Sequence, residues 1–187
     1  MYATMHDLSK FQRMMVCLDL TEMDEGIIKY ASMIANTFEL NAVYFYHVTT
    51  SFELPEDIQE KYPDLIAPVD EMLEKEVEFS VKKYFKSPEG CDIKIHVEAG
   101  GITDEILKES KVKVIDLLLV GRKEKLSGSG LNSRKVAKAT PASVIFVPEN
   151  PPLEMNQVLV SIDYSDHSRM AFEIGIDIQK KSGAKLL

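Results

Sequence analysis

The sequence contains few of the residues from which metal sites, disulfide frameworks and nucleophilic active sites are built. Its 187 residues include two cysteines and four histidines, and none of them shows the Cys-x-x-Cys or Cys/His spacing of a metal site. Cys17 and Cys91 each fall in a predicted strand, and we expect two reduced thiols in a cytoplasmic protein. The histidines are scattered over separate predicted elements, and neither Gly-x-Ser-x-Gly nor Gly-x4-Gly-Lys-Ser/Thr occurs. We therefore expect a protein that is not an enzyme.

Basic residues and long hydrophobic runs are also scarce. Lysine and arginine number 22 against 30 acidic residues, which gives a net charge of −8. This balance argues against a nucleic-acid surface, which needs clustered positive charge, although a local loop can still bind a small anion. No apolar run approaches the ~18 residues needed to span a bilayer, and residues 1–12 lack the apolar segment of a signal peptide. We expect no nucleic-acid or membrane partner, and a location in the cytoplasm.

What the sequence does contain is a repeat of domain length. Met15–Thr21 resembles Leu159–Ser165, because both are apolar runs that end in Asp, a spacer and a hydroxyl residue, 144 positions apart. So long a period indicates two copies of one fold. We expect one domain at 1–148, a Pro-rich linker at 149–154 and the start of a second similar domain, a strand and a helix, at 155–187. A lone strand–helix unit lacks a sheet, so we expect a longer natural protein or packing of this segment on the first domain or another chain.

Short apolar runs alternate with segments of helical periodicity throughout the first copy. The predicted strands are Met14–Asp19, Ala42–Val48, Ile93–Val97, Val114–Val120 and Ser143–Val147, and the second copy begins with a strand at Val158–Asp163. This alternation indicates an α/β protein with a doubly wound parallel sheet. Such sheets bind ligands beyond the carboxyl ends of the strands, where the strand order reverses. A long helix over 69–85 has an apolar stripe that we interpret as core, with a partner-binding helix as the alternative.

Five segments, in this order and spacing, resemble the universal stress protein family. They are Val16-Cys17-Leu18-Asp19, His47-Val48, Val97-Glu98-Ala99-Gly100, Asp116–Gly121 and Thr140–Pro148. The resemblance implies a five-stranded parallel sheet in the order 3-2-1-4-5, flanked by helices. It also implies pairing between modules, often through the fifth strand, which here contains Val144–Val147. With the partial second copy, the chain is similar to tandem members of the family.

Family members that bind ATP or AMP carry Gly-x2-Gly-x9-Gly-Ser/Thr after the fourth strand, and this chain matches the pattern in part. Gly121 matches the first glycine, Glu124 stands at the second, and Gly130 takes the third position in a shorter loop. Leu131 replaces the hydroxyl residue. Glycines allow backbone N–H groups to surround a phosphate, whereas Glu124 brings a negative charge to that place. The basic residues beside it favour an anion, so a phosphate cradle and a plain flexible loop both remain open interpretations.

Two functional hypotheses follow. The first is a cytoplasmic stress-response protein that dimerises or binds protein partners without catalysis, and that has a degenerate nucleotide loop and no cofactor. The second is a sensor that binds ATP or AMP in a pocket of the first domain. Its candidate binding residues are Asp19, Thr21, Val48, Gly121, Gly128 and Gly130. For Asp19, the alternative is a purely local role at the strand end or as a helix cap.

Overall fold

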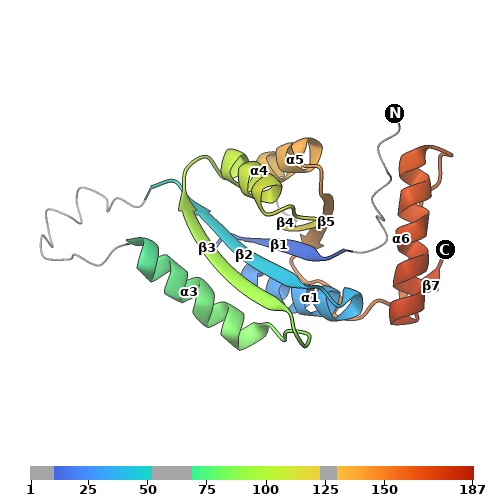
Figure 1. Cartoon of the computed structure of the whole chain (residues 1–187), viewed down its shortest axis with the longest axis horizontal. Helices are drawn as coiled ribbons and strands as arrows, with labels where there is room; N and C mark the ends of the chain where they lie inside the picture. The colour runs from blue at the N-terminus through green and yellow to red at the C-terminus, as the bar shows by residue number, and fades with distance from the viewer. Residues whose placement is uncertain (1–10, 52–68, 123–129) are drawn as a thin grey trace, which may run out of the picture.

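The predicted strand order is present in the structure. A computed structural model describes residues 11–51, 69–122 and 130–187 (Figure 1). Within them one five-stranded parallel sheet has the order β3-β2-β1-β4-β5. Its strands are β1 (Arg13–Leu18), β2 (Ala42–Thr49), β3 (Asp92–Ala99), β4 (Leu117–Arg122) and β5 (Ser143–Pro148). The order reverses at β1, which lies between β2 and β4, so a crevice is expected at the ends of these strands.

Helices cover both faces of the sheet (Figure 1). On one face lie α1 (Met23–Phe38) and α3 (Val69–Tyr84), and on the other lie α4 (Ile102–Val112) and α5 (Gly130–Ala139). The central strands are apolar without interruption because both of their faces are buried. Val16 and Phe45 pack on the α1 side, while Met15 and Leu118 pack on the α4 side.

Some predicted boundaries were wrong, for local reasons. The fourth strand begins at Leu117 rather than at Val114, because Val114 is left-handed with φ 53° and its N–H bonds back to Lys111 in the last turn of α4. At its other end the strand continues to Arg122, so Gly121 lies inside β4, paired with Val147, rather than after the strand. In α3, Val77 and Val81 are buried as expected, but Met72 in the same predicted stripe is 55% exposed.

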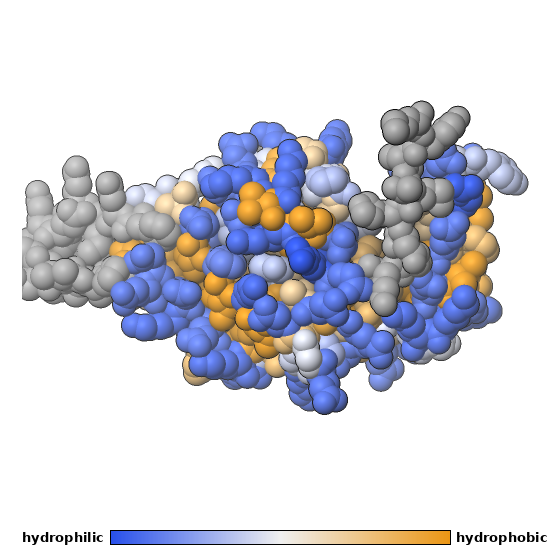
Figure 2. All heavy atoms as spheres, viewed as in Figure 1, coloured by the Kyte–Doolittle hydropathy of each residue, from blue (hydrophilic) through white to orange (hydrophobic). Residues whose placement is uncertain are grey.

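Residues 155–187 form a small β-α-β unit. A two-residue strand β6 (Gln157–Val158) pairs in parallel with β7 (Lys185–Leu186), and α6 (Asp166–Ser182) connects them. The helix was predicted, whereas the strand Val158–Asp163 was too long, because its neighbour β7 offers only two residues for pairing. Exposed apolar side chains gather in this unit, and Figure 2 shows apolar surface where α6 and β7 lie. They include Leu159, Ile162, Tyr164 and Leu187.

The backbone of this unit repeats two unusual features of the first domain at the same 144-residue offset. Leu20 has φ 56° and Tyr164 has φ 65°, so both take the left-handed conformation between the Asp and the hydroxyl residue. Glu39 and Gly183 are left-handed at the ends of α1 and α6. Non-glycine residues seldom adopt a positive φ. The likeness between the two segments therefore extends from sequence to local backbone geometry.

The unit contacts the first domain along α1. The linker crosses α1 at Gly26, where an added Cβ would lie 3.2 Å from Pro151 Cδ and 3.3 Å from the Glu149 carbonyl oxygen. At the other end of α1, Lys181 donates to the Phe38 carbonyl at 3.4 Å and lies over the Phe38 ring at 5.6 Å. Ile174 and Ile178 of α6 pack against the core on this side. Among the described residues, no helix is long and apolar enough to cross a membrane.

Candidate functional site

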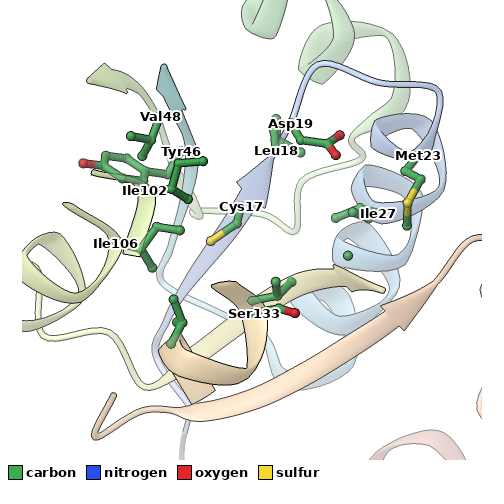
Figure 3. Close-up of a pocket in the computed structure, with 13 residues that line it drawn as sticks. Cys17, Leu18, Asp19, Met23, Ile27, Tyr46, Val48, Ile102, Ile106 and Ser133 are labelled. Atoms are coloured by element: carbon green, nitrogen blue, oxygen red, sulfur yellow. The ribbon is translucent and has the colours of Figure 1, made fainter. Parts of the chain in front are cut away.

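A cavity of about 150 Å³ opens at the carboxyl ends of β1, β2 and β4. Figure 3 shows Cys17 and Asp19 of the β1 end, Met23 and Ile27 from α1, Ile102 and Ile106 from α4, and Ser133 from α5 around it. The remaining lining residues are Leu18, Tyr46, Val48, Val120, Gly121 and Val136. Three helices and three strands, from both sides of the sheet's switch point, thus contribute to one apolar slot.

Three of the six residues predicted for a nucleotide pocket line this cavity. Asp19, Val48 and Gly121 come from the ends of β1, β2 and β4, which the sheet order brings together. Thr21 does not line the cavity, and its hydroxyl instead donates to Asp19 Oδ1 at 2.5 Å. Gly128 lies outside the described residues, and Gly130 begins α5.

Asp19 is an exposed carboxylate at the rim of the slot. It follows β1 directly, and the left-handed residue after it turns the chain toward α1. A purely local role at the strand end or as a helix cap was the alternative for Asp19. However, Glu22 occupies the N-cap of α1 and makes no side-chain capping bond. The Asp24 carboxylate turns back instead and accepts the N–H groups of Asp19 at 3.2 Å and of Leu20 at 2.9 Å.

Gly121 allows β4 and α1 to approach each other beside the slot. A Cβ at this position would lie 2.9 Å from Ile27 Cδ1 and 3.2 Å from Met23 Cε. Any larger residue would have to displace these two side chains, both of which line the cavity. The first glycine of the family pattern therefore has a packing role here that is independent of any phosphate.

Sequence reasoning missed the side chains that α1, α4 and α5 contribute. Ile102 and Ile106 stand one helical turn apart on α4, and Ser133 lies in the first turns of α5. Their spacing marks one face of each helix. However, only the packing of the helices on the sheet places these faces against the ends of β1 and β2.

The slot offers apolar walls and one carboxylate at its rim for the recognition of a ligand. Burial raises the pKa of the Cys17 thiol to about 12, so this sulfur is a neutral, apolar part of the wall. No group of three His, Cys, Asp or Glu side chains among the described residues could hold a metal ion. A cavity of about 150 Å³ with apolar walls is large enough for one flat aromatic group. The Asp19 carboxylate at the rim can accept hydrogen bonds from the polar part of such a ligand.

Comparison with solved structures places the fold among universal stress proteins. A universal stress protein in complex with cAMP matches with a TM-score of 0.54 and 18% identity, over 75% of this chain and 98% of that chain. The protein UspA from Lactobacillus plantarum matches with a TM-score of 0.52 and 16% identity, over 73% and 97%. A universal stress protein from Archaeoglobus fulgidus DSM 4304 matches with a TM-score of 0.60 and 19% identity, over 95% of this chain and 66% of that chain.

Identities of this size establish the fold alone, and among curated proteins none matches the chain significantly. The model of the universal stress protein family, however, matches residues 10–148, about three quarters of the sequence and the whole of the described five-stranded sheet. The chain therefore belongs to the universal stress protein family.

Proposed function

We propose that this protein is a cytoplasmic, non-enzymatic sensor that binds an adenine nucleotide in the slot between β1, β2 and β4. The observation that carries the proposal is the meeting of Asp19, Val48 and Gly121 around one cavity at the switch point. Ligands of open parallel sheets bind at this place. The structure in complex with cAMP is support from a relative of the same fold.

The slot favours the adenine base as the buried part of the ligand. Its volume of about 150 Å³ suits a single aromatic group, whereas pockets that take a whole drug-sized ligand measure roughly 300–1,000 Å³. The base would lie between Val48 and the apolar side chains of α1 and α4, and Asp19 would accept from its edge or from the ribose. The phosphates would then lie outside the slot, toward the start of α5.

Isothermal titration calorimetry with cAMP, AMP and ATP, with and without Mg²⁺, tests this function. We expect saturable binding of at least one of them. Asp19→Ala should weaken it about 10-fold or more, because a hydrogen bond to a charged group contributes roughly 1.5–3 kcal/mol. The matched control is Asp163→Ala, which removes the exposed Asp at the repeated position and should leave affinity unchanged. The absence of binding for all three nucleotides would refute the function, and equal affinity in both variants would refute the role of Asp19.

Self-association through β5 is a second candidate function. In the described sheet β5 is an edge strand, and Phe146 on it is 39% exposed. An unpaired edge with an exposed aromatic residue is suited to pairing with another module. Phe146→Glu should shift the protein toward monomer in light scattering over a concentration series. The control is Ile93→Glu on the opposite edge strand, where Ile93 is 41% exposed. A protein that is monomeric throughout, or a response to Ile93→Glu alone, would contradict this candidate.

We also propose that residues 155–187 are the start of a second domain of the same fold, after a linker at 149–154. The matching left-handed residues Leu20 and Tyr164 support this interpretation. If it is right, Tyr164→Gly should be tolerated or stabilising, because glycine adopts a positive φ without steric cost and the Tyr164 side chain is 98% exposed. Leu20→Gly should gain the same relief of the turn but also lose the packing of a partly buried side chain on the core. Thermal unfolding of the two variants measures this. Destabilisation by Tyr164→Gly alone would argue against equivalent turns.

A further inference from the structure

The loop that carries Asp19 is held by a buried carboxyl group from the first turn of α1. Asp24 is 5% exposed, and each of its oxygens takes one backbone N–H from the loop, Oδ1 from Asp19 and Oδ2 from Leu20. Asp24 does not line the cavity. It therefore acts on the slot only through the residue whose carboxylate stands at the rim.

The second copy forms the same turn without such a carboxyl. The position equivalent to Asp24 is Ser168, whose hydroxyl donates to the Ser165 carbonyl at 3.0 Å. Asp163 there accepts the N–H of Ser165 at 2.9 Å, and Tyr164 still reaches φ 65°. The left-handed turn thus does not require an acid at this position. A buried acid in the first copy, where the slot is, points to a role in the placement of Asp19.

The Asp19 carboxylate is close enough to influence the protonation of Asp24. The pKa of Asp24 is raised to about 6, chiefly by burial and also by the charge of the neighbouring Asp19 carboxylate, while the hydrogen bonds from the two backbone N–H groups oppose this rise. From β2, the buried His47 contacts the Leu18 carbonyl with Nδ1 at 3.0 Å, just before the loop. The positive charge of Lys83 in α3 is one of the groups that lower the pKa of Glu25, the residue after Asp24 in the first turn of α1. Asp19, His47, Glu25 and Lys83 are therefore the charged or titratable groups to be separated from Asp24 in any experiment.

We propose that Asp24 is a positioning residue for ligand binding, which in its ionised form holds the Asp19 backbone while the Asp19 carboxylate accepts hydrogen bonds from the ligand. When protonated, Asp24 donates to Asp19 and competes with the ligand for the same oxygens. Ligand binding then expels the proton, so affinity falls as the pH falls. This inference rests on the proposed function, since it assigns the pH response of that same slot.

Calorimetric titration with cAMP from about pH 8 to about pH 5 tests the inference. The phosphodiester of cAMP keeps one negative charge over this range, so the ligand does not contribute to the slope. Wild-type affinity should fall by up to about 10-fold per pH unit below about pH 6, the limit for one linked proton. Asp24→Asn should show a flat profile near the low-pH affinity of the wild type. Glu22→Gln, an exposed neighbour, and His47→Asn, which keeps a donor for the Leu18 carbonyl, should keep the wild-type slope.

A second measurement separates this role from the function itself. The backbone amide signals of Asp19 and Leu20 should titrate together in wild-type nuclear magnetic resonance spectra and should not do so in Asp24→Asn. Amides that do not titrate would overturn the inference whatever binds. Titrating amides with a pH-independent cAMP affinity, or a slope abolished by His47→Asn alone, would overturn it as well. If none of cAMP, AMP and ATP binds at any pH, the proposed function falls and the positioning role falls with it, while the amides still report whether Asp24 controls the loop.

Discussion

Replacement of Asp24 by asparagine should change how the stability of the protein depends on pH. Burial raises the pKa of Asp24 from 3.8 to about 6 in the folded state, which corresponds to about 3 kcal/mol because one pKa unit is about 1.4 kcal/mol. The folded protein holds this proton more tightly than the unfolded chain does. The stabilisation is fully present below about pH 3.8 and is lost as the pH rises through about 6. Asparagine has no proton to lose, so Asp24→Asn should escape this loss.

Urea denaturation of both proteins at several pH values measures the effect. The free energy of unfolding of Asp24→Asn minus that of the wild type should increase by about 3 kcal/mol between about pH 4 and about pH 7.5. If the substitution also alters packing or hydrogen bonding, it changes the free energy of unfolding by the same amount at every pH. This contribution cancels when the differences at two pH values are compared. Glu22→Gln, on the exposed side of the same turn, should show almost no change over the range. A difference between Asp24→Asn and wild type that is the same at every pH would refute the reasoning.

Three further outcomes are expected. Tyr46→Phe should raise the free energy of unfolding by about 1 kcal/mol, because the Tyr46 hydroxyl is buried without a hydrogen-bond partner among the described residues; lower stability in urea would reveal a partner. Asp116→Ala should cost about 2 kcal/mol, since Oδ2 accepts the N–H groups of Gln12 at 3.0 Å and Arg13 at 2.9 Å at the start of β1, and an unchanged denaturation midpoint would contradict this. A disulfide reagent should modify Cys91 well before Cys17, whose pKa is raised to about 12; equal rates by mass spectrometry would count against it.

The sheet could be predicted because its signal is local and strong. The strands β1 and β2 are continuous apolar runs, and the resemblance to a known family supplied their order. The errors arose where a residue's neighbours, rather than its own type, decide its conformation. Val114 is β-branched and reads as strand, yet the last turn of α4 holds it left-handed. The run Val158–Asp163 is equally apolar, yet its neighbour β7 offers only two residues for pairing.

The candidate site was predictable only in the residues at the carboxyl ends of strands. Asp19, Val48 and Gly121 are placed by the sheet order, so a sequence pattern that gives the order also gives their neighbourhood. The contributions of α4 and α5 depend on how those helices pack, which periodicity does not specify. Asp24 could have been found from the sequence, because it stands three positions before Ile27 and therefore on the apolar side of α1. An acid on such a face is buried, and a buried acid requires partners.

Because the Pro-rich segment crosses α1 at Gly26, this helix connects the five-stranded sheet with the β-α-β unit. Pro151 lies against the beginning of α1 and Lys181 donates to the carbonyl of Phe38 at its end, so the β-α-β unit and its linker contact this helix at both ends. A methyl group at position 26 would push Pro151 away from α1 and leave the contact of Lys181 in place. α1 begins with the cavity-lining Met23, four residues before the cavity-lining Ile27, so a displacement of the contact at Gly26 would act close to the mouth of the slot.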